Sequence, residues 1–312
     1  MRTIKLLFLI VLISNFSEKI LAQDTTNLMN QLVAESSEHK TSYTEATFKY
    51  TRVIDGQSVE NLPKNVLDLR ISHRFNPLNS GFYNFFGLDV AVMRLGFDYG
   101  ITNNFMIGVG HNVFQKTYDG FFKLKILKQS TGEVNMPVTV SFVPTIGYNT
   151  LRPQDFYVKP DSGVAVNRFS YVLQLLIARK LSENFSLQIM PTYVHPDNIS
   201  FTHIKQNIFA MGIAGTHRIT KRLSVNAEYY YQLPEDRAPG SHNVLSFGID
   251  LGTGGHVFQL LFSNSIGMTE KSFISETTGR WDNGGVQFGF NISRVFQLGE
   301  KHKRKSNDWK EK

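Results

Sequence analysis

The stretch Val286-Gln287-Phe288-Gly289-Phe290-Asn291-Ile292-Ser293 alternates strictly between apolar and polar residues. Successive side chains of an extended strand point to opposite faces, so this pattern predicts a strand with one apolar and one polar face. Such a strand suits the wall of a barrel that meets lipid outside and a polar interior. The apolar set resembles the terminal aromatic signal of outer-membrane proteins, and it comprises Val286, Phe288, Phe290, Ile292 and Phe296. We therefore expect the barrel-assembly machinery to be a partner during biogenesis.

Eleven segments further upstream show the same alternation, and each has about 9–12 residues, the length that a tilted strand needs to cross a bilayer. The twelve predicted strands are 66–75, 89–100, 105–114, 121–129, 137–148, 169–179, 185–193, 207–218, 223–233, 243–252, 256–266 and 285–296. The sequence therefore predicts an all-β fold, a transmembrane antiparallel up-and-down β-barrel of about 12 strands.

The connections between these segments alternate between long and short. The long ones are 76–88, 149–168, 194–206, 234–242 and 267–284, with 115–120 brief, and the short ones are 101–104, 130–136, 180–184, 219–222 and 253–255. Outer-membrane barrels have short periplasmic turns and longer extracellular loops, whereas a soluble sandwich has no reason to sort its loops. The pattern therefore orients the barrel and predicts that both chain ends lie in the periplasm.

Residues 1–22 have the features of a secretory signal peptide. A basic start is followed by an apolar run over 6–16, and the small residue Ala22 ends the segment. An apolar run of about eleven residues is too short to cross a bilayer as a helix. We therefore expect export through the Sec pathway to the bacterial outer membrane.

The chain contains no cysteine, which excludes a disulfide scaffold and a lipid-anchored lipoprotein.

The rest of the chain divides into three predicted parts. Residues 23–65 form a periplasmic or lumen-plugging N-terminal segment, in which 46–54 is a possible strand that ends at the turn pair Asp55-Gly56. The barrel follows over 66–298, and 299–312 is a basic periplasmic tail. The formal net charge is +7, but the signal peptide and the tail carry most of it. The nearly neutral body excludes a basic face for nucleic acid.

Several runs resemble an uncharacterised outer-membrane β-barrel family of the Bacteroidetes type, a domain of unknown function. The runs are 47–60, Ile71-Ser72-His73-Arg74-Phe75, 86–89, 98–102, Pro191-Thr192-Tyr193-Val194-His195, Ala227-Glu228-Tyr229, 254–260, Asn264-Ser265, Met268-Thr269-Glu270 and 288–294. The resemblance covers residues 45–298. It implies a location and a fold, and it implies no activity.

Strand parity places a set of charged and polar side chains on the inward face. The lumen-lining candidates are Asp68, Arg70, Arg74, Arg94, Asp98, Lys123, Lys125, Glu228, Asp250, Gln287 and Asn291. One interpretation is a network of paired charges that fills a narrow barrel, because an unpaired charge there is costly. The other is a lumen lined for a polar solute or an ion. The presence of both signs argues against strong ion selectivity.

Histidines and one loop invite a catalytic or metal-binding interpretation. By parity, five histidines face lipid near strand ends, where an amphipathic ring suits the headgroup level, and they are His73, His111, His195, His217 and His256. None has metal-ligand spacing, so we expect no metal and no cofactor. The loop 195–200 holds a histidine, an aspartate and a serine, the residue types of a lipid hydrolase. A loop leaves their orientation open, and we expect no enzyme and no catalytic residues.

Three functions therefore compete. The first is a passive channel or transport barrel for small polar or amphipathic solutes. The alternative is a plugged structural or partner-binding barrel without transport, and the second alternative is an outer-membrane lipid-modifying enzyme. Outer-membrane lipid is a partner in each case, and a small solute is a partner in the first. We expect no nucleic acid partner.

Overall fold

The computed structural model describes residues 41–157, 165–200 and 207–299. The predicted signal peptide, residues 23–40 and nearly all of the predicted tail lie outside the described residues. In the described part, no helix has the length and apolar character needed to cross a membrane.

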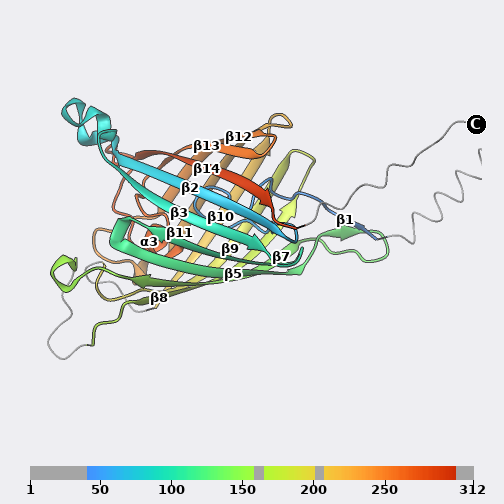
Figure 1. Ribbon diagram of the computed structural model, residues 1–312, viewed down its shortest axis with the longest axis horizontal. Coiled ribbons are helices and arrows are strands. Elements are labelled where there is room, and N and C mark those ends of the chain that lie inside the picture. Colours follow the sequence, from blue (N-terminus) through green and yellow to red (C-terminus); the bar gives the residue numbers. More distant parts are fainter. Residues whose placement is uncertain (1–40, 158–164, 201–206, 300–312) are drawn as a thin grey trace, which may run out of the picture. The chain divides into compact units, whose positions relative to one another are not determined.

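The described residues form a closed barrel of twelve strands (Figure 1). The strands are β2 (Val66–Pro77), β3 (Ala91–Gly100), β4 (Phe105–Asn112), β5 (Thr117–Leu127), β7 (Thr139–Asn149), β8 (Phe169–Lys180), β9 (Phe185–His195), β10 (Ile208–Arg218), β11 (Leu223–Gln232), β12 (Val244–Thr253), β13 (His256–Ser263) and β14 (Gln287–Gln297). Neighbours in the chain pair antiparallel, and β14 closes the barrel by pairing antiparallel with β2. Closure leaves no strand edge without partners. The predicted fold class is confirmed.

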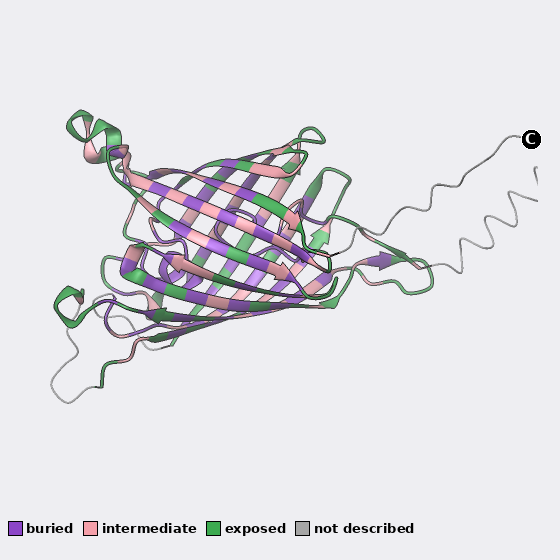
Figure 2. Cartoon of the chain, viewed as in Figure 1, coloured by how far each residue is buried: buried purple, intermediate pink, exposed green. Residues whose placement is uncertain are grey.

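Exposure alternates along the strands, as the striped colouring in Figure 2 shows. On the outer face, β12 and β13 place Phe247 opposite Phe262 and Leu251 opposite Phe258. These four side chains are exposed in the protein without lipid. In a bilayer such an apolar face meets hydrocarbon, which is the arrangement that the alternation predicts.

The histidines predicted to face lipid lie against aromatic rings of the outer face. The ring of His73 stacks on Phe290 with centroids 4.6 Å apart, and His111 lies 4.3 Å from the ring of Tyr118. His195, His217 and His256 likewise have an aromatic neighbour, respectively Tyr171, Phe185 and Phe258. These contacts suit amphipathic rings at the headgroup level.

Val286 departs from the predicted pattern. Phe288, Phe290 and Ile292 alternate with the buried residues of β14, but Val286 precedes the strand and is buried. Its carbonyl accepts a hydrogen bond from Leu78 N–H, and the pairing of β14 with β2 changes register between Gln287 and Gly289. The prediction that Val286 shares the outward face is therefore wrong, because strand parity holds only where the register is regular.

Tight turns connect the strands at one end of the barrel, which we call the short-turn end. Ile101, Leu181 and Ile219 each donate a main-chain hydrogen bond of 3.0 Å to the carbonyl four residues later. The opposite, long-loop end carries η1 (Leu78–Ser80), η2 (Phe82–Gly87), η3 (Phe114–Lys116), η4 (Pro153–Asp155), η5 (Pro234–Asp236) and the helix α3 (Glu270–Ser275). Two further short strands, β1 (Ser42–Tyr43) and β6 (Ser130–Thr131), form a separate two-stranded sheet.

Candidate functional site

The interior of the barrel is occupied by residues 47–62, which we call the plug segment. Residues 51–59 are all buried. The chain enters at the short-turn end, where Lys180 Nζ bonds the carbonyl of Glu45. It returns to the same end, where a side chain at Gly100 would clash with the carbonyl of Pro63. Both ends of the plug segment therefore lie at one mouth of the barrel.

The plug segment reverses direction at its tip. Val53 N–H donates to the carbonyl of Gly56 over 2.9 Å, and Ser58 N–H donates to that of Thr51 over 3.0 Å. A single bridge pairs Arg52 with Gln57, and no strand is formed over 46–54. The possible strand predicted there is therefore replaced by a narrow hairpin of bends, while the predicted turn pair stands at its tip. The closed wall offers this segment no strand edge to join.

The carboxylate of Glu228, on β11, binds the tip of the plug segment. It accepts hydrogen bonds from the N–H groups of Ile54 (3.2 Å), Asp55 (3.0 Å) and Gly56 (3.1 and 3.2 Å). A Cβ atom at Gly56 would lie 2.4 Å from the hydroxyl of Tyr230, so only glycine fits so close to the wall. One wall side chain thus satisfies three buried main-chain donors.

Other wall side chains bind the carbonyl groups of the plug segment. Lys123 Nζ, on β5, donates to the carbonyls of Thr51, Ser58 and Glu60, each over 2.9 Å. Gln188, on β9, accepts from Val59 N–H over 2.9 Å and donates to the carbonyl of Gln57 over 2.7 Å. Polar groups of the segment that would otherwise be costly to bury are therefore paired with the wall.

Ion pairs add to this interface. Arg74 Nη2 lies 2.5 Å from Asp55 Oδ1, and both side chains are almost completely buried. Arg52 Nη1 lies 3.1 Å from Glu270 Oε1 of α3, so the plug segment also contacts the long loop between β13 and β14. Pairing matters because removing one partner of a buried ion pair leaves the other charge uncompensated, which lowers the stability of the folded protein by about 3–5 kcal/mol.

All eleven lumen-lining candidates lie on the inner face of the wall. Arg74, Lys123, Lys125, Glu228 and Asn291 contact the plug segment. Asp250 instead accepts from Gln259 over 2.6 Å, and Asp68 accepts from the hydroxyl of Ser293 and lies 3.8 Å from Arg70. Arg94 pairs with Asp119 across β3 and β5. Asp98 and Gln287 are buried on the same face.

Sequence reasoning missed several members of this network. Asp119 belongs to β5 but lies just before the predicted strand that began at 121, so extending that strand by one alternation would have found it. Arg52, Asp55 and Glu270 lie outside the strands, where no parity rule applies. The apolar residues Val53 and Ile54 belonged to the possible strand 46–54, but that pattern did not show that their side chains pack inside the barrel.

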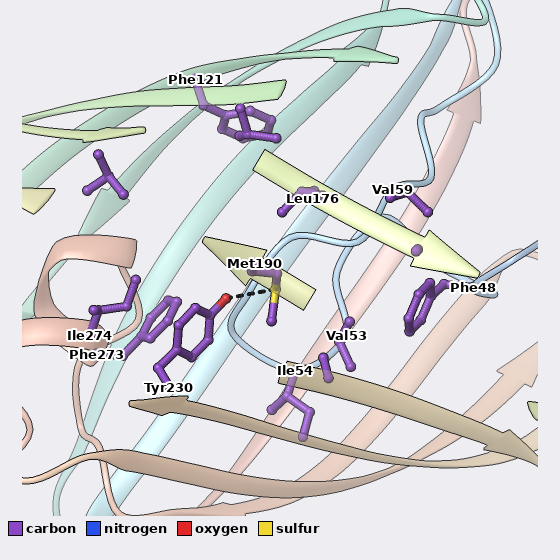
Figure 3. Packing of buried hydrophobic residues seen from close by; sticks show 14 of the residues in the cluster. Phe48, Val53, Ile54, Val59, Phe121, Leu176, Met190, Tyr230, Phe273 and Ile274 are labelled. Atoms are coloured by element: carbon purple, nitrogen blue, oxygen red, sulfur yellow. Dashed lines mark hydrogen bonds between the residues drawn. The ribbon is translucent and has the colours of Figure 1, made fainter. Parts of the chain in front are cut away.

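Apolar packing completes the filling of the lumen (Figure 3). Phe48, Val53, Ile54 and Val59 from the plug segment, with Phe273 and Ile274 from α3, belong to one buried cluster with wall residues such as Leu176. Tyr230 bridges the parts, because its ring lies 5.3 Å from that of Phe273 and its hydroxyl reaches the sulfur of Met190 at 3.2 Å.

A second buried network lies at the long-loop end around Lys271 of α3. Its ammonium group lies 3.0 Å from Asp197 Oδ2 and 2.9 Å from Glu276 Oε1. It also donates to Gln115 Oε1 at 3.0 Å and Ser200 Oγ at 2.9 Å. Burial opposes the charge of Lys271, but Glu276 and Asp197 outweigh it and raise the pKa of Lys271. The amine therefore stays protonated at neutral pH.

This network also separates the residues of loop 195–200. Asp197 and Ser200 are buried and bond each other and Lys271, whereas His195 lies against Tyr171 and Asn207. Within the described residues, the histidine makes no contact with the serine that it would have to activate. A protonated lysine in its place cannot accept the proton of the hydroxyl.

A cavity of about 700 Å³ opens at the short-turn end between the plug segment and the wall. A small cavity further inward, beside Arg52 and Asn291, measures about 10 Å³, which is about the space of one water molecule. The buried residues of the plug segment and of α3 occupy the lumen beyond the outer cavity.

These features define a class of protein, a membrane-spanning β-barrel whose lumen is filled by its own chain. The chain belongs to the family described as membrane bound beta barrel domain (DUF5777), whose model matches residues 48–296. The predicted membership of a β-barrel family of unknown function is thereby confirmed. A comparison with curated protein sequences finds no match.

Solved structures with a similar fold include three outer-membrane barrels. The NanC porin has 11% identity and a TM-score of 0.45, with 75% of this chain and 100% of that one covered. The KdgM porin in complex with disordered oligogalacturonate has 8% identity and a TM-score of 0.45, with 74% and 99% covered. Omp33 of Acinetobacter baumannii has 10% identity and a TM-score of 0.41, with 77% and 100% covered. At such low similarity no solute is carried over.

Proposed function

We propose that the protein is a channel-forming barrel of the outer membrane that its own plug segment holds closed. The observation that supports this function best is the way the segment is held. Polar and charged wall residues bind its main chain, and both of its ends lie at the short-turn end. Displacing the segment would leave a polar passage for small polar solutes.

The path of the chain makes such a displacement possible without unfolding the wall. A hairpin whose two ends emerge at one mouth can withdraw through that mouth, and every strand pair of the barrel stays closed. The wall that remains carries Lys123, Glu228 and Arg74, which water would then hydrate. Charges of both signs predict weak selectivity between cations and anions.

A second candidate function is a permanently plugged barrel that serves as a structural or partner-binding element. The apolar contacts favour it, because Val53, Ile54 and Val59 are almost completely buried and pack in one cluster with the wall. Withdrawing them would expose these side chains to water and would cost roughly 1.5–3 kcal/mol of hydrophobic stabilisation for each one. An energetic cost of this size favours the closed state and leaves opening to an external force or partner.

Single-channel recording in planar bilayers tests the proposed function. We expect the full chain to give no sustained stepwise conductance, because the lumen is filled. A variant in which a flexible linker replaces residues 47–60 should show conductance steps, and one that also lacks α3 should show larger steps.

A variant without residues 82–86 is the matched control, because it loses a piece of exposed loop at the long-loop end and should stay silent. Steady conductance of the full chain would contradict closure by the plug segment. Silence of the variant that lacks both the plug segment and α3, once gel mobility shows a folded barrel, would remove the channel and leave the structural element.

A further inference from the structure

The cavity at the short-turn end is lined by more positive than negative groups. Lys49, Arg70, Lys221 and Arg222 contribute four cations, and Glu60 and Asp68 contribute two carboxylates. Apolar side chains, including Phe48, Leu62 and Val257, line the rest. We call this cavity the vestibule. Its volume of about 700 Å³ falls in the range of pockets that hold small organic molecules.

The carboxylates of the vestibule already have partners. Asp68 accepts from the hydroxyl of Ser293. Glu60 accepts from Phe48 N–H at 3.3 Å and lies 3.4 Å from Lys125 Nζ. These acids are therefore held by the protein itself, and among the described residues only Asp68 lies within ion-pair distance of a vestibule cation, 3.8 Å from Arg70.

The cations, in contrast, have N–H donors without a hydrogen-bond partner among the described residues. Arg70 is buried, its closest approach to Asp68 is 3.8 Å, and its Nε atom has no hydrogen-bond partner among the described residues. Arg52 lines the inner end of the space together with Arg70, and its Nε and Nη2 atoms likewise lack partners there. Buried guanidinium donors normally find an acceptor, so this geometry points to an acceptor supplied from outside.

Tyr50 provides a neutral donor at the same place. Its side chain lines both the vestibule and the inner end, and its hydroxyl is buried without a partner in the described part of the chain. Burial raises the pKa of Tyr50, so the hydroxyl keeps its proton at neutral pH and remains a donor. The nearby Asp250 acts in the same direction on this pKa.

The entrance is formed by the turn between β10 and β11. Lys221 and Arg222 are exposed there, and their side chains form no ion pair among the described residues. Lys49 Nζ donates to the carbonyl of Arg222 over 2.9 Å, and this bond joins the beginning of the plug segment to this turn. Two exposed cations thus lie at the entrance, and two buried guanidinium groups, those of Arg52 and Arg70, lie further inside.

We propose that the vestibule binds a small organic carboxylate from the periplasmic side. The carboxylate group reaches Arg70 and the hydroxyl of Tyr50, the apolar body packs against Phe48 and Val257, and Lys221 and Arg222 attract the anion at the entrance. A planar guanidinium group matches a carboxylate through paired hydrogen bonds. This inference is independent of the proposed channel, because the site exists in the closed barrel.

Titration calorimetry on the full, folded chain in detergent tests the proposal with two matched probes, naphthalene-2-carboxylate and naphthalene-2-carboxamide. We expect saturable binding of one carboxylate per chain and at least tenfold weaker binding of the carboxamide. The double variant Lys221→Gln, Arg222→Gln should weaken carboxylate binding about tenfold, and raised salt should do the same, because exposed charges are screened.

Arg179→Gln is the control for these surface changes, since Arg179 is exposed near another short turn and does not line the vestibule. It should bind the carboxylate as the unmodified chain does. Equal affinity for the two probes would overturn the proposal, and so would a double variant that binds the carboxylate unchanged. Because both substituted residues are exposed, a folding defect is not expected to mask the result.

Discussion

Replacing Glu228 by alanine should release the tip of the plug segment from the barrel wall. The carboxylate satisfies three buried N–H groups, those of Ile54, Asp55 and Gly56. Each buried donor left without a partner costs about 1–3 kcal/mol. Together they should shift the equilibrium toward the withdrawn segment by about 3 kcal/mol or more, which is over a hundredfold in population.

Thiol labelling measures this release directly, because the chain has no cysteine of its own. Thr51→Cys places a thiol at a buried position of the plug segment whose hydroxyl makes no hydrogen bond in the described structure. We expect slow labelling in this background and labelling that is faster by a factor of a hundred or more when Glu228→Ala is added. Glu228→Gln keeps one acceptor oxygen and should fall between the two.

Glu235→Ala is the matched control for the loss of a carboxylate, since Glu235 is exposed in η5 at the long-loop end. It should leave the labelling rate unchanged. An equally slow rate in Glu228→Ala, with the barrel folded, would contradict the role of Glu228 as the main attachment of the tip.

The second large effect is expected from Lys271→Met, measured as the loss of stability of the folded barrel. The methionine has similar length but leaves the buried carboxylates of Asp197 and Glu276 without their cation. Removing one partner of a buried ion pair costs about 3–5 kcal/mol. We expect a loss of this size in urea unfolding followed by heat-modifiable gel mobility.

The loss should depend on pH with a definite sign. Burial raises the pKa of Glu276, and Lys271 opposes this shift. Without Lys271 the pKa of Glu276 should rise further, so the folded variant binds more protons than the unfolded chain and loses stability as pH increases. The defect of the variant should therefore be large at pH 7 and become smaller as the pH falls through the range in which Glu276 is protonated.

Lys116→Met serves as the control, because Lys116 is an exposed lysine of the same end of the barrel. Its stability should match that of the unmodified chain at each pH. A defect in Lys271→Met that stays constant between pH 4 and 7 would show that lost packing, and not uncompensated carboxylates, is its cause.

The alternation of residues was sufficient to predict the wall of the barrel. Leu67, Leu69 and Ile71 alternate with Asp68 and Arg70 in the sequence, and burial alternates in the same way along β2. A strand has a fixed period of two, so its faces follow from local order alone. Val286 and Asp119 mark where this reasoning ends, because one lies beside a register shift and the other beyond the predicted strand.

The partners of the inward charges could not be found in the same way. Glu228 binds Asp55 N–H across 173 positions of the chain, and Arg52 meets Glu270 across 218. Asp55 and Arg52 do not lie on a strand, so no periodic pattern in the sequence predicts which way their groups point. Two alternatives for residues 23–65, periplasmic or lumen-plugging, were equally compatible with their polar composition.

By itself, the sequence determined that this chain builds a membrane barrel with a polar inner face, because each strand repeats its pattern every two residues and must match lipid on one side. Only the tertiary structure decided what fills that barrel. Residues 47–62 enter the lumen because the wall offers carboxylates, amides and ammonium groups that pair with their main chain. The helix α3 joins them through side-chain contacts, of Glu270 with Arg52 and of Phe273 with Tyr230. Such pairing depends on the closed shape of the wall, which exists only after all twelve strands have met.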